Sequence, residues 1–194
     1  SAYSLYKGYA EVSKDGKCGF VNTKGEVAVE LEYDTVYDIS EGLFLVVKDD
    51  KYGFVNDEGT EVIKPRYDMA YSFSCGFALV EKDEKYGYIN KKGDMIIACD
   101  FDDAEGFEDD FAIVCKEDEY GLINKRGKFV IEPEYESMKY AGEGFYSVFK
   151  DGAWGVVNIK NKEILKLDYD KIGYVNFGLI PVNKGDDFAY FNKK

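Results

Sequence analysis

The stretch CDFDDAEGFEDDF at residues 99–111 crowds seven acidic residues into thirteen positions. Carboxylate oxygens are the ligands that calcium prefers, and a calcium site needs six or more oxygens. We select Asp102, Asp103, Asp109 and Asp110 as the candidate metal ligands. The alternatives are a solvated acidic loop and a docking patch for a basic partner.

Three tyrosines, Tyr3, Tyr37 and Tyr71, stand 34 residues apart and form a second candidate site. They lie between apolar positions, so their rings are expected to point away from the core. Aligned exposed tyrosines can stack on sugar rings or anchor a protein partner. Partial burial between neighbouring units is the structural alternative.

Two further sets of charged residues recur and are interpreted as structural. A lysine stands at a strand end in every unit, beside acidic turns, where its charge discourages pairing with another strand edge. Six aligned lysines could also bind an anion. The set is Lys14, Lys48, Lys82, Lys116, Lys150 and Lys184. An acidic residue follows a buried aromatic residue in pairs such as Tyr33-Asp34, and we interpret the acid as turn-forming. The alternative is that these acids together form a circular set of calcium ligands.

Catalysis is not expected from this sequence. An enzyme needs each catalytic group once, whereas these residue types recur. Acids are plentiful but no single pair stands out, so a glycosidase with two carboxylates is only a remote alternative. The chain has no His and no Cys-x-x-Cys pair, and no cofactor is expected. Its four cysteines each occupy a different phase of the repeat, which favours free thiols and, mildly, the cytoplasm.

The net charge of −13 bears on possible partners. It disfavours nucleic acid and anionic membrane surfaces. No apolar run approaches the roughly 20 residues that cross a bilayer, so no membrane insertion is expected. The chain starts with Ser1, which leaves open an exported protein whose leader was removed.

A strict 34-residue period organises all these residues. A glycine recurs at this spacing, and an asparagine stands three positions after it. We assign structural roles to Gly19, Asn22, Gly53, Asn56, Gly87, Asn90, Gly121, Asn124, Trp154, Gly155 and Asn158. A fixed period of this size indicates stacked supersecondary units.

One unit contains four short segments. The first reads as a short strand with a bulge or a tight bend. The second has apolar residues on both faces, which indicates cover on both faces. The third carries an aromatic residue, such as Trp154, that is expected to be buried between units. The recurrent glycine follows it, and we expect this glycine to lie opposite the recurrent valine of the second segment. The missing side chain is expected to let a neighbouring aromatic ring lie flat there. The asparagine begins a type I turn that leads into the fourth segment.

The repeated Tyr-Gly, the AWG at residues 153–155, and IKPRYD and IEPEYE at residues 63–68 and 131–136 resemble the bacterial WG-repeat (KWG-repeat) family. The resemblance covers nearly the whole chain. Cys18 and the Phe188-Ala189 pair depart from the pattern. The resemblance implies a bacterial origin and a binding or scaffolding role, and it supplies no catalytic residues.

We therefore predict an all-β single domain of tandem 34-residue repeats. The units are 1–34, 35–68, 69–102, 103–136, 137–170 and 171–194, the last lacking one strand. A small six-bladed β-propeller is the first architecture, although its repeats usually run to roughly 40–50 residues. An open β superhelix is the alternative.

The predicted function is a non-enzymatic interaction module that binds a protein or a peptide. A module that binds a glycan or the cell wall through the tyrosine surface is the alternative.

Overall fold

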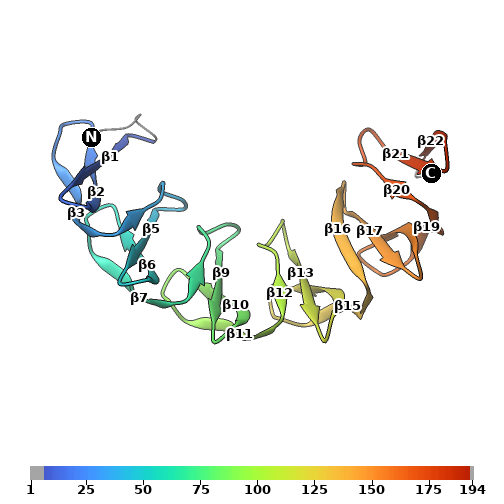
Figure 1. The fold of residues 1–194 in the computed structure, drawn as a ribbon, viewed down its shortest axis with the longest axis horizontal. Coiled ribbons are helices and arrows are strands. Elements are labelled where there is room, and N and C mark those ends of the chain that lie inside the picture. Colours follow the sequence, from blue (N-terminus) through green and yellow to red (C-terminus); the bar gives the residue numbers. More distant parts are fainter. Residues whose placement is uncertain (1–6, 193–194) are drawn as a thin grey trace. The chain divides into compact units, whose positions relative to one another are not determined.

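The computed structural model describes residues 7–192. Twenty-two strands form six small antiparallel sheets, and the described residues contain no helix. Each sheet is formed by one continuous segment of the chain, as the colours of Figure 1 show, and none of the described sheets closes into a barrel. The prediction of an all-β chain of tandem repeats is confirmed.

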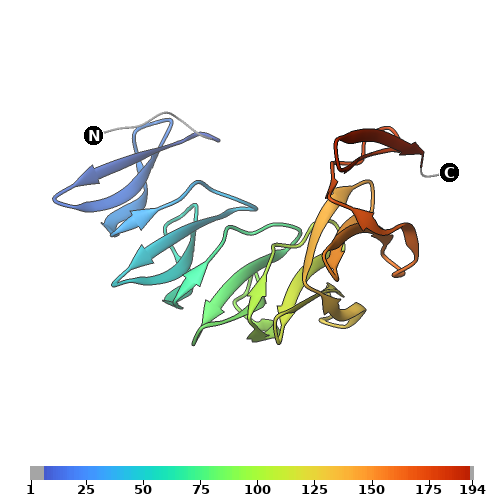
Figure 2. The ribbon, with the colours of Figure 1, turned by 45° about the vertical axis from the view of Figure 1, so that its right-hand side comes forward.

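Within each sheet the strands also follow chain order, so each sheet is a simple meander (Figure 2). The first three sheets consist of β1 (Tyr9–Lys14), β2 (Lys17–Asn22) and β3 (Val27–Tyr33); β4 (Thr35–Val36), β5 (Leu43–Lys48), β6 (Lys51–Asn56) and β7 (Glu61–Tyr67); β8 (Met69–Ala70), β9 (Phe77–Lys82), β10 (Lys85–Asn90) and β11 (Met95–Phe101).

The last three sheets repeat this plan. They consist of β12 (Asp103–Ala104), β13 (Phe111–Lys116), β14 (Glu119–Asn124) and β15 (Phe129–Tyr135); β16 (Ser137–Gly142), β17 (Phe145–Lys150), β18 (Ala153–Asn158) and β19 (Glu163–Tyr169); β20 (Lys171–Ile172), β21 (Leu179–Lys184) and β22 (Asp187–Asn192).

The chain forms two compact units. One comprises residues up to 100 together with 106–109, and the other comprises 101–105 together with the residues from 110 onward. The single domain and the unit boundaries that the sequence suggests stay predictions.

Two-residue turns join pairs of six-residue strands, such as β5 and β6, in the first five sheets. In the turns at 15–16, 49–50, 83–84, 117–118 and 151–152, both residues have φ between 51° and 81°. This is the type I′ geometry whose twist matches that of paired strands. The turn fixes the register that places Val46 opposite Gly53, as expected from the sequence.

The recurrent asparagine begins the next turn, as predicted. The Asn56 side-chain oxygen accepts hydrogen bonds from the backbone N–H groups of Glu58 (3.1 Å) and Thr60 (2.8 Å). Gly59 then adopts a φ of 76°, which glycine accepts without strain. Asn161 takes the same place once with a φ of 56°, because asparagine tolerates this conformation well.

The recurrent glycine is required by the backbone of the strand beside it. Tyr52 pairs with Tyr67 and Phe54 pairs with Ile63, so Gly53 alone faces three residues of β7. A Cβ at Gly53 would lie 2.5 Å from the Pro65 nitrogen. We expected a flat aromatic ring at this place, and that expectation is wrong, because the bulged strand fills the space first.

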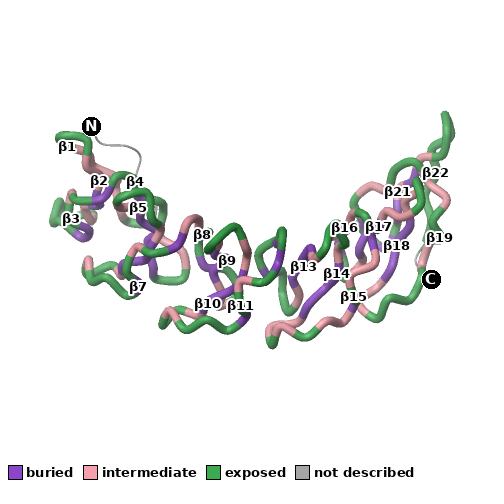
Figure 3. The backbone as a smooth tube through the Cα atoms, turned by 60° about the horizontal axis from the view of Figure 1, so that its bottom comes forward, coloured by how far each residue is buried: buried purple, intermediate pink, exposed green. Residues whose placement is uncertain are grey.

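The core lies between consecutive sheets of each compact unit. Phe44 and Val46 of β5 pack with Phe20 and Val29 of the first sheet. Leu45, which lies between them in sequence, packs instead in the cluster that includes the third sheet. Successive residues of one strand therefore bury opposite faces, as predicted, and Figure 3 shows the buried positions along the longer strands.

The aromatic residue before the glycine is less buried than expected. Trp154 is half-buried; its ring centroid lies 5.2 Å from that of Phe149, and Lys139 Nζ lies 5.5 Å from the Trp154 centroid. One face of the indole is thus covered by a side chain that also reaches solvent.

The close approach at Gly53 predicts that Gly53→Ala destabilises the protein by more than about 2 kcal/mol, because either the new methyl group or the β7 backbone must move. Urea unfolding measures this change. Gly106→Ala is the matched control, since a Cβ there meets no atom within 4 Å. Equal midpoints for the two variants would contradict the bulge explanation.

Candidate binding site

Tyr37 and Tyr71 occupy equivalent places directly after the two-residue strands β4 and β8. The Tyr37 backbone N–H donates to the Leu45 carbonyl oxygen (2.9 Å), and the Tyr71 N–H donates to that of Leu79 (2.9 Å). These bonds extend each short strand by one residue, and both rings are exposed. Tyr3, the third predicted member, lies outside the described residues.

A groove of about 250 Å³ opens between the second and third sheets. Both sheets lie in the same compact unit. The lining is mainly apolar and aromatic, and it includes both predicted tyrosines: Tyr37, Leu45, Tyr52, Met69, Ala70, Tyr71 and Ser72. The structure therefore brings Tyr37 and Tyr71 together around one hollow.

Tyr52 forms a wall of this groove, and we did not select it from the sequence. Its ring packs against the buried cluster that contains Leu45, Ile63 and Tyr67, which holds it in place. Burial raises the pKa of Tyr37, and a hydrogen bond with Tyr52 adds to the effect. Tyr37 therefore stays a neutral phenol at physiological pH.

The same phases carry different chemistry in the fifth sheet. Lys139 stands where Tyr37 stands, and Trp154 stands where Tyr52 stands. The lysine ammonium lies over the indole ring there. An apolar side chain that fits between Tyr37 and Tyr52 would meet the charge of Lys139 at the equivalent position of the fifth sheet. The tyrosine groove is therefore not reproduced in that sheet.

The acidic residues at 102–110 have separate partners. Asp102 accepts the Glu117 backbone N–H (2.8 Å), and Asp103 accepts the Ala104 N–H (2.9 Å) and the Tyr120 hydroxyl (3.1 Å). Burial, followed by the bond to Asp103, raises the pKa of Tyr120 to about 12. Across residues 7–192, no group of three or more His, Cys, Asp or Glu side chains is placed to hold a metal ion.

The other two predicted ligands lie at a turn. Asp110 pairs with Lys125 at 3.0 Å. Asp109 has a φ of 53°, whereas Asp110 does not adopt a positive φ. The glycines at the phase of Asp110, such as Gly42 with a φ of 87°, do adopt one. The turn at 109–110 therefore differs in shape from the equivalent turns. It requires no positive φ at residue 110, so aspartate can stand there in place of glycine.

Asp102 shares its role with the acids at the same phase. Asp34, Asp68, Glu136 and Asp170 each accept a backbone N–H from the hairpin turn fifteen residues later. The sequence indicated a turn-forming acid, and the structure shows that the turn is distant in sequence. Asp34 also pairs with Lys17 at 2.5 Å, and Asp68 pairs with Lys51.

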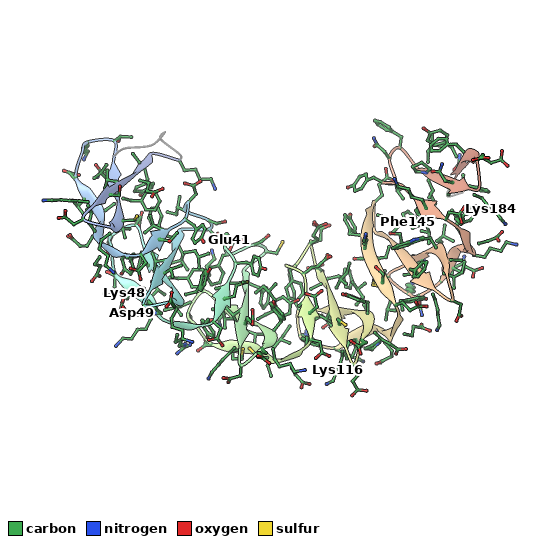
Figure 4. The ribbon with its side chains drawn as sticks, in the orientation of Figure 1. Glu41, Lys48, Asp49, Lys116, Phe145 and Lys184 are labelled. Carbon is green, nitrogen blue, oxygen red and sulfur yellow. The ribbon has the colours of Figure 1, made fainter. Side chains whose placement is uncertain are left out.

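Three of the six recurrent lysines form ion pairs with nearby acids. Lys48 pairs with Glu32 at 2.6 Å, Lys150 with Glu134 at 3.3 Å and Lys184 with Asp168 at 2.6 Å. Figure 4 labels Lys48, Lys116 and Lys184 at the ends of β5, β13 and β21. These three pairs agree with a structural role for the lysines and require no bound anion.

The four cysteines are all free thiols, as expected. Burial raises the pKa of Cys18, Cys99 and Cys115, which lowers the reactivity of those thiols. In the described part of the chain, no helix is long and apolar enough to cross a bilayer.

The chain matches a known family over most of its length. A model of the WG-containing repeat matches residues 19–52, 52–86, 86–120, 120–152 and 154–186. No curated protein matches the chain.

Solved structures with the same kind of fold are known. The chain resembles Hsv2p from Kluyveromyces lactis with a TM-score of 0.52 and 13% identity, covering 94% of this chain and 75% of that one. It resembles a eukaryotic initiation factor with a TM-score of 0.60 and 11% identity, covering 98% of this chain and 61% of that one. Both neighbours are propeller-like, and at these identities the likeness concerns the fold alone.

The paired acids predict a loss of stability in acid. The bond from Lys17 lowers the pKa of Asp34 most, followed by that from the Asp49 N–H, and Lys51 and the Asp83 N–H act likewise on Asp68. A depressed folded pKa adds stability above the unfolded value, near 3.9, and this stability is lost as pH falls through the folded pKa.

We expect the melting temperature of the wild type to decrease when the pH is lowered below about 4. The Asp34→Asn/Asp68→Asn double variant is expected to have a lower melting temperature at pH 7 and a smaller decrease in acid. Thermal melts from pH 7 to pH 3 measure both slopes, with Asp15→Asn as an exposed control. Parallel curves for the wild type and the double variant would contradict the role of these pairs.

The calcium hypothesis stays a prediction. If Asp102, Asp103, Asp109 and Asp110 bind calcium, millimolar calcium raises the melting temperature, because a ligand of the folded state stabilises it. An unchanged melting temperature would leave the solvated loop as the interpretation.

Proposed function

The chain belongs to the WG-containing repeat family, and we propose that it is a non-enzymatic interaction module that binds a protein or peptide partner in the groove of Tyr37, Tyr52 and Tyr71. One observation carries the proposal: two exposed tyrosines from successive repeats border the same apolar hollow. Tyrosines give large contact areas at a low cost in conformational entropy, so they are frequent anchors of protein partners.

The lining favours an apolar segment of the partner. Leu45, Met69 and Ala70 form the apolar part of the hollow, and its volume of about 250 Å³ suits one or two side chains rather than a whole domain. Aromatic-lined grooves of this kind accept extended segments, including proline-rich ones. The net charge of −13 favours partners with basic residues beside the anchor, because such charges accelerate association.

A glycan is the second candidate, since aligned tyrosines can stack on sugar rings. A sugar also needs hydrogen-bond partners for its hydroxyl groups. The lining supplies only the tyrosine hydroxyls and Ser72 for this purpose. This supply is small for a sugar and ample for an apolar peptide side chain.

A glycosidase is less well supported. A general acid needs a carboxyl group whose pKa is raised. The pKa values of Glu32, Asp34 and Asp68 are lowered instead, each chiefly through a hydrogen bond from a lysine. Such carboxylates are stable anions at neutral pH and poor proton donors.

The test is a selection from a displayed random peptide library against the full chain, beside a glycan array. We expect peptides with an apolar or proline-rich anchor. Tyr37→Ser/Tyr71→Ser is expected to weaken their binding at least about 30-fold, which is about 2 kcal/mol and typical of a contact hot spot. Calorimetry measures the affinity, and Tyr174→Ser, an exposed tyrosine outside the groove, is the control.

The Tyr37→Phe/Tyr71→Phe variant separates the two ligand classes. It keeps the rings and removes the hydroxyls, so a peptide anchored by apolar contact is expected to retain its affinity within a few-fold, whereas a glycan is expected to lose it. Retained peptide binding by the double serine variant, with cooperative unfolding, would refute the groove as the binding site.

A further inference from the structure

A second groove lies on the fourth sheet, beside its edge strand β15. The groove has a volume of about 580 Å³, and all its lining residues belong to the second compact unit. They come from β13, the turn after it, β14 and β15: Lys116, Glu117, Glu119, Phe129, Glu132 and Pro133. Three carboxylates and one ammonium therefore surround an aromatic ring and a proline.

Two charges of this lining are reversed relative to the second sheet. Glu119 stands at the phase of Lys51, and Glu132 stands at the phase of Lys64. In the second sheet, Lys51 forms an ion pair with Asp68. The fourth sheet has thus lost two cations at phases where the fold accommodates them, and its groove is left with an excess of negative charge.

The three carboxylates of the groove are available to a ligand. Within residues 7–192, the side chains of Glu117, Glu119 and Glu132 form no hydrogen bond and no ion pair, and all three residues are exposed. Glu32, by contrast, already binds Lys48 at 2.6 Å. Carboxylates that are gathered in one groove and left unpaired attract a cationic group of a partner.

Phe129 gives this groove an aromatic wall that the second and fifth sheets lack. Glu61 and Glu163 stand at the same phase in those sheets. The Phe129 ring centroid lies 6.2 Å from that of buried Phe101, with the two planes at 90°, and Phe129 itself is only half-buried. The ring is therefore held from one side and remains partly accessible, so a cation that binds the carboxylates can also contact it.

The groove suits a side chain better than an added strand. Pro133 has no backbone N–H to donate from the edge of β15. The strand is also bulged at this place, because Tyr120 pairs with Tyr135 and Leu122 pairs with Ile131. A bulge and a proline both oppose the pairing of a further strand with this edge.

We propose that this groove binds an arginine side chain of a protein or peptide partner. The guanidinium group pairs with Glu119 and Glu132, and the aliphatic stem lies against Phe129 and Pro133. Arginine fits this lining better than lysine does, because its planar group matches carboxylates in a bidentate manner and stacks on aromatic rings. The proposal does not depend on the tyrosine groove, whose lining residues all belong to the first compact unit.

An NMR titration of the nitrogen-labelled full chain tests the proposal. The probe is a peptide of sequence Gly-Arg-Ser-Arg-Gly with blocked ends, beside matched peptides in which lysine or citrulline replaces both arginines. We expect the arginine peptide to shift the amides of residues 116–120 and 129–132. The lysine peptide is expected to bind about three-fold more weakly, and the neutral citrulline peptide at least about 10-fold more weakly. Added salt is expected to weaken the binding of the arginine peptide.

Charge reversal separates binding in the groove from general attraction to an acidic protein. Glu119→Lys/Glu132→Lys is expected to weaken binding of the arginine peptide at least about 10-fold. The control, Glu30→Lys/Glu58→Lys, makes the same change in net charge at two exposed acids of the first compact unit and is expected to bind within about two-fold of the wild type. Lysine stands at all four of these phases in other repeats, so both variants are expected to fold. Phe129→Val is expected to weaken binding about three-fold.

Several results would overturn the proposal. These are a wild type that does not bind the arginine peptide, amide shifts spread over the acidic surface instead of the groove, equal losses in the two double lysine variants, and a lysine or citrulline peptide that binds as tightly as the arginine peptide. The amide spectrum of each variant shows whether it is folded. Tyr37→Ser/Tyr71→Ser is expected to bind the arginine peptide like the wild type, so a failure of this proposal is distinguishable from a failure of the tyrosine groove.

Discussion

Each sheet of this protein has two apolar faces, and the fold depends on keeping both faces from water. A strand such as β5 sends Phe44 and Val46 to one neighbour and Leu45 to the other. Fully burying one such side chain contributes about 1.5–3 kcal/mol. An isolated sheet of three or four short strands would expose one or both faces, so its stability comes from the repeat beside it.

The recurrent residues serve this constraint, which leaves function to the positions that vary. Gly53 admits the bulged backbone of β7, Asn56 closes the turn before it, and Asp68 holds the hairpin of the next repeat. None of these groups is available for a ligand without loss of structure. The side chains at the phase shared by Tyr37, Tyr71 and Lys139 take no part in these turns and bulges. At this phase the second and third sheets form a groove.

Local chemistry could be predicted from the sequence, whereas contacts between distant residues could not. The asparagine turn was predictable because its hydrogen bonds stay within four residues. The partner of Gly53 was not, because three residues of β7 face one residue of β6. A glycine inside a strand signals a bulge or a close approach, but it does not say which strand approaches it. Tyr52 was missed as a groove wall because its phase also holds Trp154, which we assigned to structure alone.

The dependence of each sheet on its neighbours is tested most directly by native-state hydrogen exchange, resolved by strand, at a concentration where the chain is monomeric. The β9–β10 and β17–β18 pairs, whose sheets have neighbours on both sides, are expected to exchange slowly and β22 to exchange fastest among the long strands. Amides of β22 as well protected as those of β10 would contradict the claim that a neighbouring repeat supplies the stability of each sheet.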